Sequence, residues 1–447
     1  MTERSVWAVV GAGSAGCVVA SRLSEDPRRT VVLVEAGPDL RPGEVPPAIS
    51  SPDALAAIDV AGRTWPDLEA TRVAGRSASR YVRGRGVGGS SAINAMVALR
   101  GSTVQYERWG WNDVDTMWEA CLIPEEPADP DEFGPIDRAL LGAAEDAAPV
   151  PLTRRAGRRV TSAEAYLWPA LDRPNLEIRA GSQVDRVLVA GRRATGVRLL
   201  DGSEIAADRV VVCAGTLHSP AILLRSGVDV AGLGHGLQDH PSVPLTLRYR
   251  PGAAPPSGGL AVATLLQRDD VQVLPMNHLG AGGAGHGLLL IALMRPASRS
   301  GRVRLSSGDP TASPVVDFDL LSEPVDVERL RAGIRLAADI VRSESFTEII
   351  EDVLIDSSGT SLDALTTDAE IDRWLSATTG DYVHATGTCA MGVVVDDDAA
   401  VVGYHGLYVC DASVFPSIPD VNTHLPTTML AERLTARWRA AASGETR

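Results

Sequence analysis

The hydrophobic positions near the start of the chain form two short continuous runs with a helix-like pattern between them. Residues 6–10 and 31–34 are apolar runs of strand length, and glycines follow the first run directly. The helix-like pattern passes through Arg22 and Leu23. Strand, helix and strand in this order predict the first βαβ unit of a doubly wound sheet.

From about residue 175 the pattern changes to an alternation of apolar and polar positions. Three alternating segments predict a small antiparallel meander: 176–179, 184–189 and 196–200. Asp201 and Gly202 are typical of a hairpin turn. A buried strand is predicted at 209–213, and a helix is predicted from Ser219, with Pro220 in its first turn.

A second set of elements follows after residue 259, and the first pattern then returns. Strands are predicted at 260–267, 271–276, 287–294 and 302–306, helices at 325–343 and 366–376, a strand at 407–410 and a C-terminal helix from Pro426. The sequence therefore predicts an α/β protein with two domains. A discontinuous Rossmann-like domain takes residues 1–130, 175–245 and 385–447, and a smaller α+β domain on an antiparallel sheet takes 131–174 and 246–384.

Composition excludes several classes of partner and location. The 447 residues carry a formal net charge of −15, which argues against nucleic acid and anionic membrane surfaces as partners. No stretch approaches the apolar length of a membrane span, and no secretory signal precedes the first strand. We therefore expect a cytoplasmic protein without a membrane span.

The basic and sulfur-containing residues exclude several chemistries. Every basic residue is arginine, so Schiff-base lysine enzymes and P-loop nucleotide binding are excluded. The 5 cysteines are odd in number and form no Cys-x-x-Cys pair. They predict neither a disulfide framework nor a zinc site, and no metal site is expected.

Three glycines follow the first strand and open the first helix. Gly11 permits a tight turn, Gly13 lets the backbone approach a pyrophosphate, and Gly16 lets the helix pack on the strand. Glu35 closes the second strand, where a carboxylate can bind ribose hydroxyls. The pattern predicts a bound dinucleotide; the alternative is a glycine turn that only packs.

A second glycine-rich stretch, Arg83 to Met96, combines close-approach glycines with hydroxyl and amide side chains. It resembles the first signature of the glucose–methanol–choline (GMC) family of flavin oxidoreductases. Residues 213–228 resemble the second signature, and 237–241 and 411–416 are further family-like elements. Together these segments span nearly the whole chain in the family's order, and the chain is similar to a short bacterial member.

The resemblance implies that the dinucleotide is FAD and that the Rossmann-like domain binds it. It places the segment Ser90 to Val97 at the flavin, with Asn94 and Ala95 near the isoalloxazine. Val184 is expected to meet adenine, and Asp411 and Ala412 to approach the diphosphate and the ribityl chain. Further contacts are expected from Gly11, Gly13, Ser14, Ala15, Gly16, Glu35, Ala36, Val87, Gly89, Met96, Ala214, Thr423, Pro426 and Thr427.

The mode of FAD attachment is also implied. Some family members hold the flavin covalently through a histidine in the first signature, and Ile93 stands at that place here. Non-covalent FAD is therefore expected.

Two histidines near the end of the chain are the catalytic candidates. His384 lies in a stretch that resembles the family's catalytic His-x-x-Gly-Thr, and His424 lies where family members carry His or Asn. A histidine suits removal of a hydroxyl proton, and a second polar group can stabilise the developing alkoxide. We expect His384 to be the base and His424 its partner. Structural roles are expected for the other six histidines: His218, His235, His240, His278, His286 and His405.

The resemblance implies oxidation of an alcohol CH–OH to an aldehyde or ketone, with hydride transfer to flavin N5. Two alternatives stay open: a non-redox FAD-dependent lyase on the same fold, and a nicotinamide-dependent dehydrogenase that uses the same glycine pattern. The expected substrate is a small alcohol or, if the short chain has a trimmed lid, a glycoside. The electron acceptor, whether oxygen, a quinone or a redox cofactor, stays open.

Overall fold

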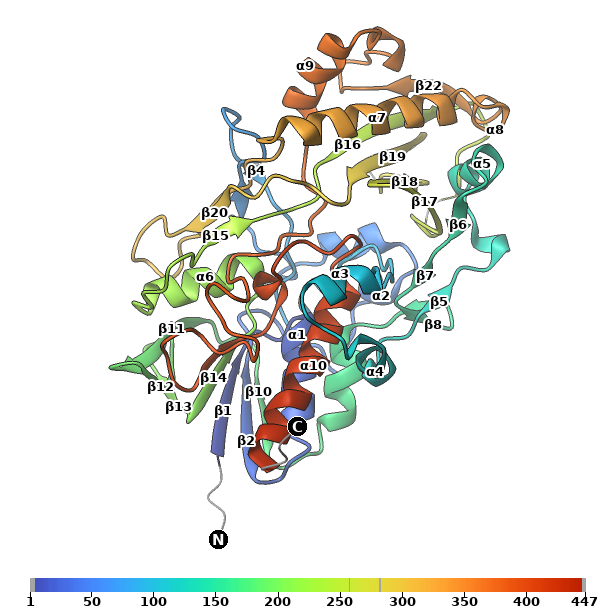
Figure 1. Ribbon diagram of the computed structural model, residues 1–447. Helices are drawn as coiled ribbons and strands as arrows, with labels where there is room; N and C mark the ends of the chain where they lie inside the picture. The colour runs from blue at the N-terminus through green and yellow to red at the C-terminus, as the bar shows by residue number, and fades with distance from the viewer. Residues whose placement is uncertain (1–4, 257, 281–282, 444–447) are drawn as a thin grey trace.

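The computed structural model describes residues 5–256, 258–280 and 283–443. Two large sheets of different kinds dominate it, one at each end of the molecule (Figure 1). Strands β1, β2, β10 and β14 lie at one end, and β16 to β19 lie at the other beneath helix α7. Loops from both ends of the chain fill the middle layer, where the candidate site lies.

The first sheet is parallel and contains the predicted βαβ unit. Its strand order is β10 (Leu176–Arg179), β2 (Arg29–Val34), β1 (Ser5–Val10), β14 (Arg209–Val212) and β23 (Leu407–Val409). Its three inner strands are almost wholly buried, as their valine-rich sequences require. Helix α1 (Ser14–Leu23) links β1 to β2, and the C-terminal helix α10 (His424–Ser443) packs against α1. The ends of the chain therefore meet in one α/β layer.

The predicted meander is correct for two of its three strands. β11 (Val184–Ala190) and β12 (Arg193–Leu199) pair with β13 (Glu204–Ala206) in a separate antiparallel sheet. Residues 176–179, predicted as part of that meander, instead form β10 at the edge of the parallel sheet beside β2. Alternation identifies a half-buried strand but does not identify its partner, and that explains the error.

Helix α6 (Gly215–Arg225) begins four residues before the predicted start at Ser219, so Pro220 lies inside it. A proline has no N–H to donate to the carbonyl four residues earlier, here that of Thr216. The hydroxyl of Thr388 donates to this carbonyl instead, at 2.6 Å. A contact from a distant segment therefore compensates for the proline, which the local pattern does not reveal.

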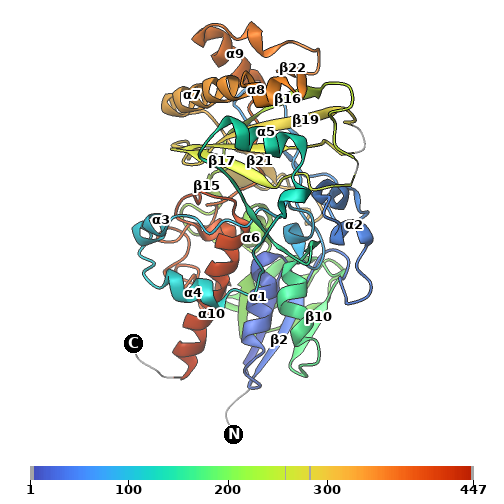
Figure 2. The same cartoon turned by 90° about the vertical axis from the view of Figure 1, so that its right-hand side faces the viewer.

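The second large sheet is antiparallel and has six strands. Its order is β22 (Ile350–Leu354), β16 (Ser242–Tyr249), β19 (His286–Leu293), β18 (Val271–Met276), β17 (Thr264–Arg268) and β6 (Ala147–Pro149). Helix α7 (Pro324–Val341) packs on this sheet, with α5 (Pro135–Ala143), α8 (Glu344–Thr347) and α9 (Asp368–Thr378) beside it (Figure 2). A hydrophobic core lies between the sheet and these helices.

The two faces of this sheet take alternate residues of each strand. On β19, Leu289 and Ile291 enter the core under α7, whereas Leu290 belongs to a different hydrophobic cluster on the opposite side. On β18, Val273 faces α7 and Leu274 belongs to that second cluster. Both faces are apolar because both are covered, one by helices and one by the middle layer of the molecule.

Three sets of contacts cross the predicted domain boundaries. The whole of β16, from Ser242, belongs to the six-stranded sheet, although residues up to 245 were predicted in the Rossmann-like domain. The π-helical turn η4 (Ala163–Leu167), predicted in the smaller domain, packs against α1. The strand predicted at 302–306 is β20 (Gly301–Arg304), which pairs with β15 (His235–Leu237) and β21 (Val315–Asp317) in a separate sheet. The domain assignment stays a prediction.

The remaining elements are short. They are α2 (Pro47–Ser50), α3 (Thr103–Arg108), α4 (Val114–Ala120), β3 (Glu69–Ala70), β4 (Ser79–Arg80), β5 (Glu126–Pro127), β7 (Pro151–Leu152), β8 (Arg154–Arg155), β9 (Arg158–Arg159), and the helical turns η1 (Ala54–Asp59), η2 (Gly89–Ala92), η3 (Pro130–Glu132), η5 (Trp168–Ala170), η6 (Leu362–Ala364) and η7 (Ala412–Val414). In the part of the chain that the structure describes, no helix combines the length and apolar character needed to cross a membrane.

Candidate active site

The glycine turn after β1 is tightly packed at two of its three glycines and open at the third. A Cβ on Gly11, whose φ is +99°, would lie 2.5 Å from the carbonyl oxygen of Cys213. A Cβ on Gly16 would lie 1.8 Å from the carbonyl oxygen of Gly11, whereas one on Gly13 would meet no protein atom within 4 Å. The fold therefore needs the outer two glycines. Gly13, the N-cap of α1, leaves the helix N-terminus open to a phosphate.

Glu35 joins the glycine turn to the second glycine-rich stretch. Its Oε2 accepts a hydrogen bond from the N–H of Ala12 at 2.8 Å, and its Oε1 accepts from Gly37 at 2.9 Å and Gly86 at 2.8 Å. An ionised carboxylate has about four acceptor positions, so about one stays free for a ribose hydroxyl. The carboxylate thus organises the backbone of the site besides lining it.

One cavity of about 890 Å³ extends from the glycine turn to the catalytic candidates. It is of the size and shape that proteins use for cofactors. Most of the predicted site residues line it: Gly11, Gly13, Ser14, Ala15, Glu35, Ala36, Gly89, Ser90, Asn94, Ala95, Met96, Val97, Val184, Ala214, His384, Asp411, Ala412, Thr423, His424 and Thr427.

Three predicted contact residues lie behind the cavity wall instead. Gly16 is packed against the backbone of Gly11, and the side chain of Val87 is buried in the core of the parallel-sheet domain. Pro426 is buried in the first turn of α10. These residues shape the backbone of the site, and none of the three lines the cavity.

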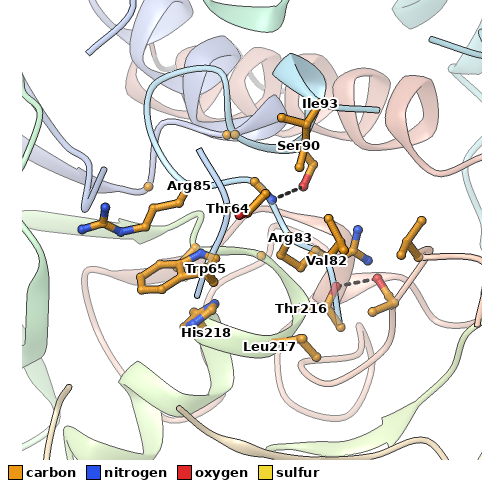
Figure 3. Close-up of a pocket in the computed structure, with 18 of the residues that line it drawn as sticks. Thr64, Trp65, Val82, Arg83, Arg85, Ser90, Ile93, Thr216, Leu217 and His218 are labelled. Atoms are coloured by element: carbon orange, nitrogen blue, oxygen red, sulfur yellow. Dashed lines mark hydrogen bonds between the residues drawn. The ribbon is translucent and has the colours of Figure 1, made fainter. Parts of the chain in front are cut away.

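The second glycine-rich stretch is folded against the first. A Cβ on Gly89 would lie 2.6 Å from the Cα of Gly13, so two backbones touch here. The hydroxyl of Ser90 accepts a hydrogen bond from the N–H of Gly84 at 3.1 Å (Figure 3). Asn94 accepts from the N–H of Met96 at 3.1 Å, and Met96 itself has a φ of +63°. These contacts fix the segment that was predicted to meet the flavin.

A buried arginine, missed by the sequence analysis, holds this segment from behind. Arg159 donates to the backbone carbonyl and the side-chain oxygen of Asn94, each at 2.7 Å, and to the carbonyl of Ile49 at 2.9 Å. Burial lowers the pKa of Arg159 to about 10, so it stays charged at neutral pH. It places a positive charge behind the predicted flavin contact.

His384 sits in a strained turn and contacts two polar side chains. The residue before it, Val383, has a φ of +55°, which a β-branched side chain rarely adopts. The Nδ1 of His384 lies 3.0 Å from the Nδ1 of His240, and its Nε2 lies 3.4 Å from the Nδ2 of Asn422. Burial, assisted by His240 and Arg83, holds the pKa of His384 well below its usual range. The imidazole is therefore neutral and able to accept a proton.

Asp239 holds the backbone of this turn. Its carboxylate accepts from the N–H groups of His240 at 2.8 Å, Tyr382 at 3.1 Å and His384 at 2.9 Å, and from the hydroxyl of Tyr81 at 2.9 Å. Burial raises the pKa of Asp239 to about 7, against the opposing effects of these hydrogen bonds and of a nearby arginine. Through Asp239, the segment 237–241 therefore holds the backbone of the His384 turn in place.

His424, the second catalytic candidate, lies over the glycine turn. Its Nδ1 lies 3.0 Å from the hydroxyl of Ser14, and its Nε2 is buried without a hydrogen-bond partner in the protein. Burial lowers the pKa of His424 to about 4, so this ring is also neutral. The structure places Asn422 next to His384, and it places His424 next to Ser14. All four residues line the same cavity.

A group of aromatic and charged side chains lines another part of the cavity (Figure 3). The rings of Trp65 and His218 are stacked with centroids 4.2 Å apart, and the guanidinium of Arg85 lies 5.4 Å from the centre of the Trp65 ring. Burial lowers the pKa of His218 to about 4. Stacked neutral rings beside a cation offer a surface for a flat ligand group.

Asp411 ties the end of β23 to the start of α6. Its Oδ2 accepts from the N–H of Gly215 at 2.9 Å and the hydroxyl of Ser219 at 2.5 Å, and its Oδ1 accepts from the N–H of Ser413 at 2.8 Å. Burial raises the pKa of Asp411, and the hydroxyls of Ser219 and Ser413 oppose that rise. The predicted contact thus has a structural role, and its neighbour Ala412 also lines the cavity.

The residues present fit FAD. Gly13 offers an open helix N-terminus for a diphosphate, and Glu35 keeps a carboxylate at the end of β2 for a ribose. The cavity is lined by residues of both glycine-rich stretches and of the His384 turn, so it connects these three parts of the chain. Near that turn, Asn422 Oδ1 and His424 Nε2 are buried polar atoms without a protein partner. Such atoms are expected where a ligand completes the hydrogen bonding.

Sequence reasoning missed Asn422, His240, Asp239 and Arg159. Asn422 stands two residues before His424, and either could be chosen from the sequence because both amide and imidazole suit the chemistry. His240 and Asp239 lie inside a recognised family-like element at 237–241, and their position in it was an available signal. No signal pointed to Arg159, because the contact that gives it a role joins segments 65 residues apart.

Comparisons with known proteins agree with the motifs. Two family models, each described as GMC oxidoreductase, match this chain: one over residues 8–121 and 135–242, the other over 296–431. Together they cover most of the chain. The segment 243–295, which contains β17, β18 and β19, lies outside the matched ranges.

Similar proteins extend over nearly the full chain. A GMC-type oxidoreductase of Rhodococcus erythropolis is 32% identical over 504 aligned residues, covering 98% of this chain and 99% of the relative. The 5-(hydroxymethyl)furfural oxidase of a Methylovorus species is 30% identical over 521 aligned residues, covering 96% and 97%. Both alignments are longer than the 447 residues of this chain, so both relatives carry insertions relative to it.

A solved structure shares the fold closely. Pyridoxine 4-oxidase from Mesorbium loti superimposes with a TM-score of 0.88 at 27% identity, over 97% of this chain and 99% of that one. The site therefore belongs to a known class of flavoprotein, and the nicotinamide-dependent alternative is set aside. The chain is a member of the GMC oxidoreductase family, an FAD-dependent oxidoreductase that acts on alcohol-type donors.

Proposed function

We propose that this enzyme oxidises the CH–OH group of a small uncharged alcohol to an aldehyde or ketone, with His384 as the general base. The observation that carries the proposal is the contact of His384 with Asn422 on the wall of the cavity, 3.4 Å between Nε2 and Nδ2. A base and an amide that lie this close can both reach one hydroxyl oxygen.

His384 is suited to take the hydroxyl proton at its Nε2. Because burial keeps the ring neutral, a lone pair is available at neutral pH. The carboxylate of Asp239 accepts hydrogen bonds from the backbone N–H of His384, so the backbone position from which the ring extends is fixed. A base in a defined position avoids the entropy cost of finding its geometry during the reaction.

Asn422 is suited to be the partner of His384. Its side-chain oxygen is buried without a protein partner, and its amide nitrogen lies against the base. The amide can donate to an alkoxide as charge develops there. His424, the partner predicted from the sequence, lines the same cavity, but its hydrogen bond to Ser14 favours a role at the cofactor.

FAD, when bound, supplies the acceptor for the hydride that leaves the carbon bearing the hydroxyl. The residues that would hold it are Gly13 and Ser14 at the diphosphate, Val184 at the adenine and the segment Asn94 to Val97 at the isoalloxazine. The side chain of Ile93 is aliphatic and 94% buried, so we also propose that attachment is non-covalent.

The apolar wall near His384 favours an uncharged substrate. Leu274, Met276 and Leu290 line the cavity from the six-stranded sheet, and they cluster with Tyr382, which precedes the His384 turn. The hydroxyl of Tyr382 is already bonded to Gln272 at 2.8 Å, so this wall presents mainly carbon. Burying a charged or heavily hydroxylated substrate here would leave polar groups unpaired, at a cost of about 1–3 kcal/mol each.

Names of relatives include this class and a second one. One relative and one solved structure are named for 5-(hydroxymethyl)furfural and for pyridoxine, which are uncharged or weakly charged ring compounds with hydroxymethyl groups, whereas other relatives, 30–31% identical, are named for choline, a cation. We propose hydroxymethyl-bearing rings and short aliphatic alcohols as the first candidates. Glycosides, allowed by the length of the chain, are less favoured by the aliphatic wall.

Anaerobic reduction of the bound flavin tests the proposal. The protein, loaded with FAD, is mixed with ring-bearing primary alcohols, short aliphatic alcohols, glycosides and choline, and the loss of flavin absorbance is followed. We expect reduction by members of the first two groups. His384→Ala should keep its FAD and lose about 10²- to 10⁴-fold in the rate of reduction, the usual contribution of a general base. Unchanged reduction by this variant would refute the assignment of the base.

A further inference from the structure

His240 was expected to be a structural histidine, and its contacts give it a directional role. Its Nε2 lies 2.9 Å from the carbonyl oxygen of Pro419, in the loop before α10, and its Nδ1 lies 3.0 Å from the Nδ1 of His384. The ring is wholly buried. The two imidazole planes are nearly perpendicular, at 86°, with centroids 5.2 Å apart.

The protonation of His240 follows from its carbonyl partner. A carbonyl oxygen only accepts hydrogen bonds, so the Nε2 of His240 must carry the hydrogen. Burial lowers the pKa of His240 to about 4, against the opposing effects of the backbone of Pro419 and of Met294, and a neutral imidazole has a single N–H. The Nδ1 of His240 is therefore an acceptor with a lone pair directed at His384.

The position of the hydrogen on His384 follows from that on His240. Two ring nitrogens 3.0 Å apart form a hydrogen bond only if one donates, and His240 has no hydrogen left at that position. The Nδ1 of His384 therefore carries the hydrogen, and its Nε2 keeps the lone pair. Asn422 agrees with this assignment, because the group it presents to Nε2 is an amide N–H donor.

We propose that His240 is a positioning residue that selects the tautomer of His384 in which Nδ1 is protonated and Nε2 is free to act as the base. The proposal rests on the proposed function of His384. The chain of contacts runs from the carbonyl of Pro419 through His240 to His384 and is built entirely from protein groups. Second partners of catalytic histidines commonly fix ring orientation and tautomer in this way.

The selection has a consequence for the proton that His384 takes up. When Nε2 accepts the hydroxyl proton, the ring becomes an imidazolium with hydrogens on both nitrogens. The Nδ1–H bond to His240 is retained and becomes charge-assisted, and such bonds are stronger than neutral ones. The other groups that face the ring are Tyr382, Arg83, Asn422 and the backbone-bound carboxylate of Asp239. Arg83 opposes the positive charge, and His240 opposes it only when its own ring is charged, which the low pKa of His240 prevents at neutral pH.

Two substitutions separate tautomer selection from simple packing. His240→Asn places an amide oxygen close to the former Nδ1 position and keeps an acceptor for His384. His240→Leu fills similar space but removes the acceptor. Because the chain has 8 histidines, spectra of protein labelled with ¹⁵N in histidine are simple, and His384→Ala identifies the signal of His384. Long-range ¹H–¹⁵N spectra then report which nitrogen is protonated, with and without added FAD.

We expect His384 to carry its hydrogen on Nδ1 in the unmodified protein and in His240→Asn, and to move it wholly or partly to Nε2 in His240→Leu. Flavin reduction by substrate should fall about 10²-fold or more in His240→Leu at similar KM, and recover at least in part in His240→Asn. FAD content and thermal unfolding show that each variant is folded. If His240→Leu does not fold, the tautomer in the unmodified protein and in His240→Asn still decides.

An Nε2-protonated His384 in the unmodified protein would overturn the inference, as would an unchanged tautomer in folded His240→Leu. These results are distinct from failure of the proposed function. If His384→Ala reduces its flavin normally, the base is elsewhere, whatever the tautomer of His384 is found to be.

Discussion

The parallel-sheet part and the six-stranded sheet each supply a wall of the same cavity, and they do so with different chemical groups. At the parallel sheet the wall is mainly backbone: glycines 11, 13 and 89 and open N–H groups, with the carboxylates of Glu35 and Asp411. At the six-stranded sheet the wall is aliphatic side chains on alternate positions of β18 and β19. One wall is suited to a constant ligand, the cofactor, and the other can vary with the substrate.

The two walls also differ in the substitutions that they tolerate. A backbone wall depends on the absence of Cβ atoms, and a single methyl group at the wrong glycine is a collision with main chain. An aliphatic wall depends on volume and polarity, which side chains can exchange with smaller penalties. The following four predictions test this contrast, beginning with the largest expected effect.

Replacing Gly16 should damage the fold, whereas replacing Gly13 should damage only ligand binding. A Cβ on Gly16 would lie 1.8 Å from a carbonyl oxygen, so Gly16→Ala should lower the free energy of unfolding of the apoprotein by about 3 kcal/mol or more. Gly13→Ala meets open space and should change it by less than about 1 kcal/mol. Urea unfolding of the apoproteins and titration with FAD measure both effects.

The expected result for Gly13→Ala is weaker FAD binding in a folded protein. If Gly13→Ala bound FAD as well as the unmodified chain does, the open space at this glycine would not be the diphosphate site. Equal stability of the two variants would contradict the packing argument.

Replacing Asn422 should slow flavin reduction more than replacing His424 does. Asn422→Ala removes the group 3.4 Å from the base, and a loss of about 10- to 100-fold in the rate of flavin reduction is expected. His424→Ala removes a ring bonded to Ser14, so its main expected effect is weaker FAD binding. Rapid-mixing reduction at saturating FAD, with FAD titration beside it, measures both. The reverse order of effects would restore His424 as the partner of the base.

A carboxylate on the aliphatic wall should shift substrate preference toward cations. Leu290→Glu places a negative charge in the cavity, and choline and its uncharged analogue 3,3-dimethylbutan-1-ol form a matched pair of similar shape. We expect the ratio of kcat/KM for choline over the analogue to rise about 10-fold, equivalent to about 1.4 kcal/mol, with FAD affinity unchanged. Loss of FAD instead would show that Leu290 faces the cofactor and not the substrate.

The last prediction concerns pH. Burial lowers the pKa of His240 to about 4, so between pH 4 and its ordinary value the unfolded chain holds a proton that the folded chain does not. Stability therefore falls as the pH falls through this window, by about 1.4 kcal/mol per pH unit for each such proton. His240→Asn should make the dependence of the apoprotein's unfolding free energy on pH less steep by about that amount. An unchanged slope would mean that this ring is not held neutral.

Local patterns predicted the strands of both walls, including those that form β18 and β19, and missed features that depend on distant partners. The βαβ unit, the glycine turn and the cofactor residues lie in continuous motifs, so their sequence neighbours are also their neighbours in space. Strand β10 was assigned to the wrong sheet, and the start of α6 was misplaced by four residues, because each depends on a distant partner. The aliphatic wall comes from every second residue of strands whose pairing the sequence does not state.

By itself the sequence determined the family, the dinucleotide turn and His384 as the candidate base, because glycine spacing and short motifs act through backbone geometry that neighbouring residues create. Only the tertiary structure decided that Asn422 rather than His424 lies against His384, and that His240 directs its lone pair at the same ring. Hydrogen bonds between side chains need positions within a few tenths of an ångström. Those positions arise when residues 38 and 144 positions apart in the chain are packed together, which no local pattern encodes.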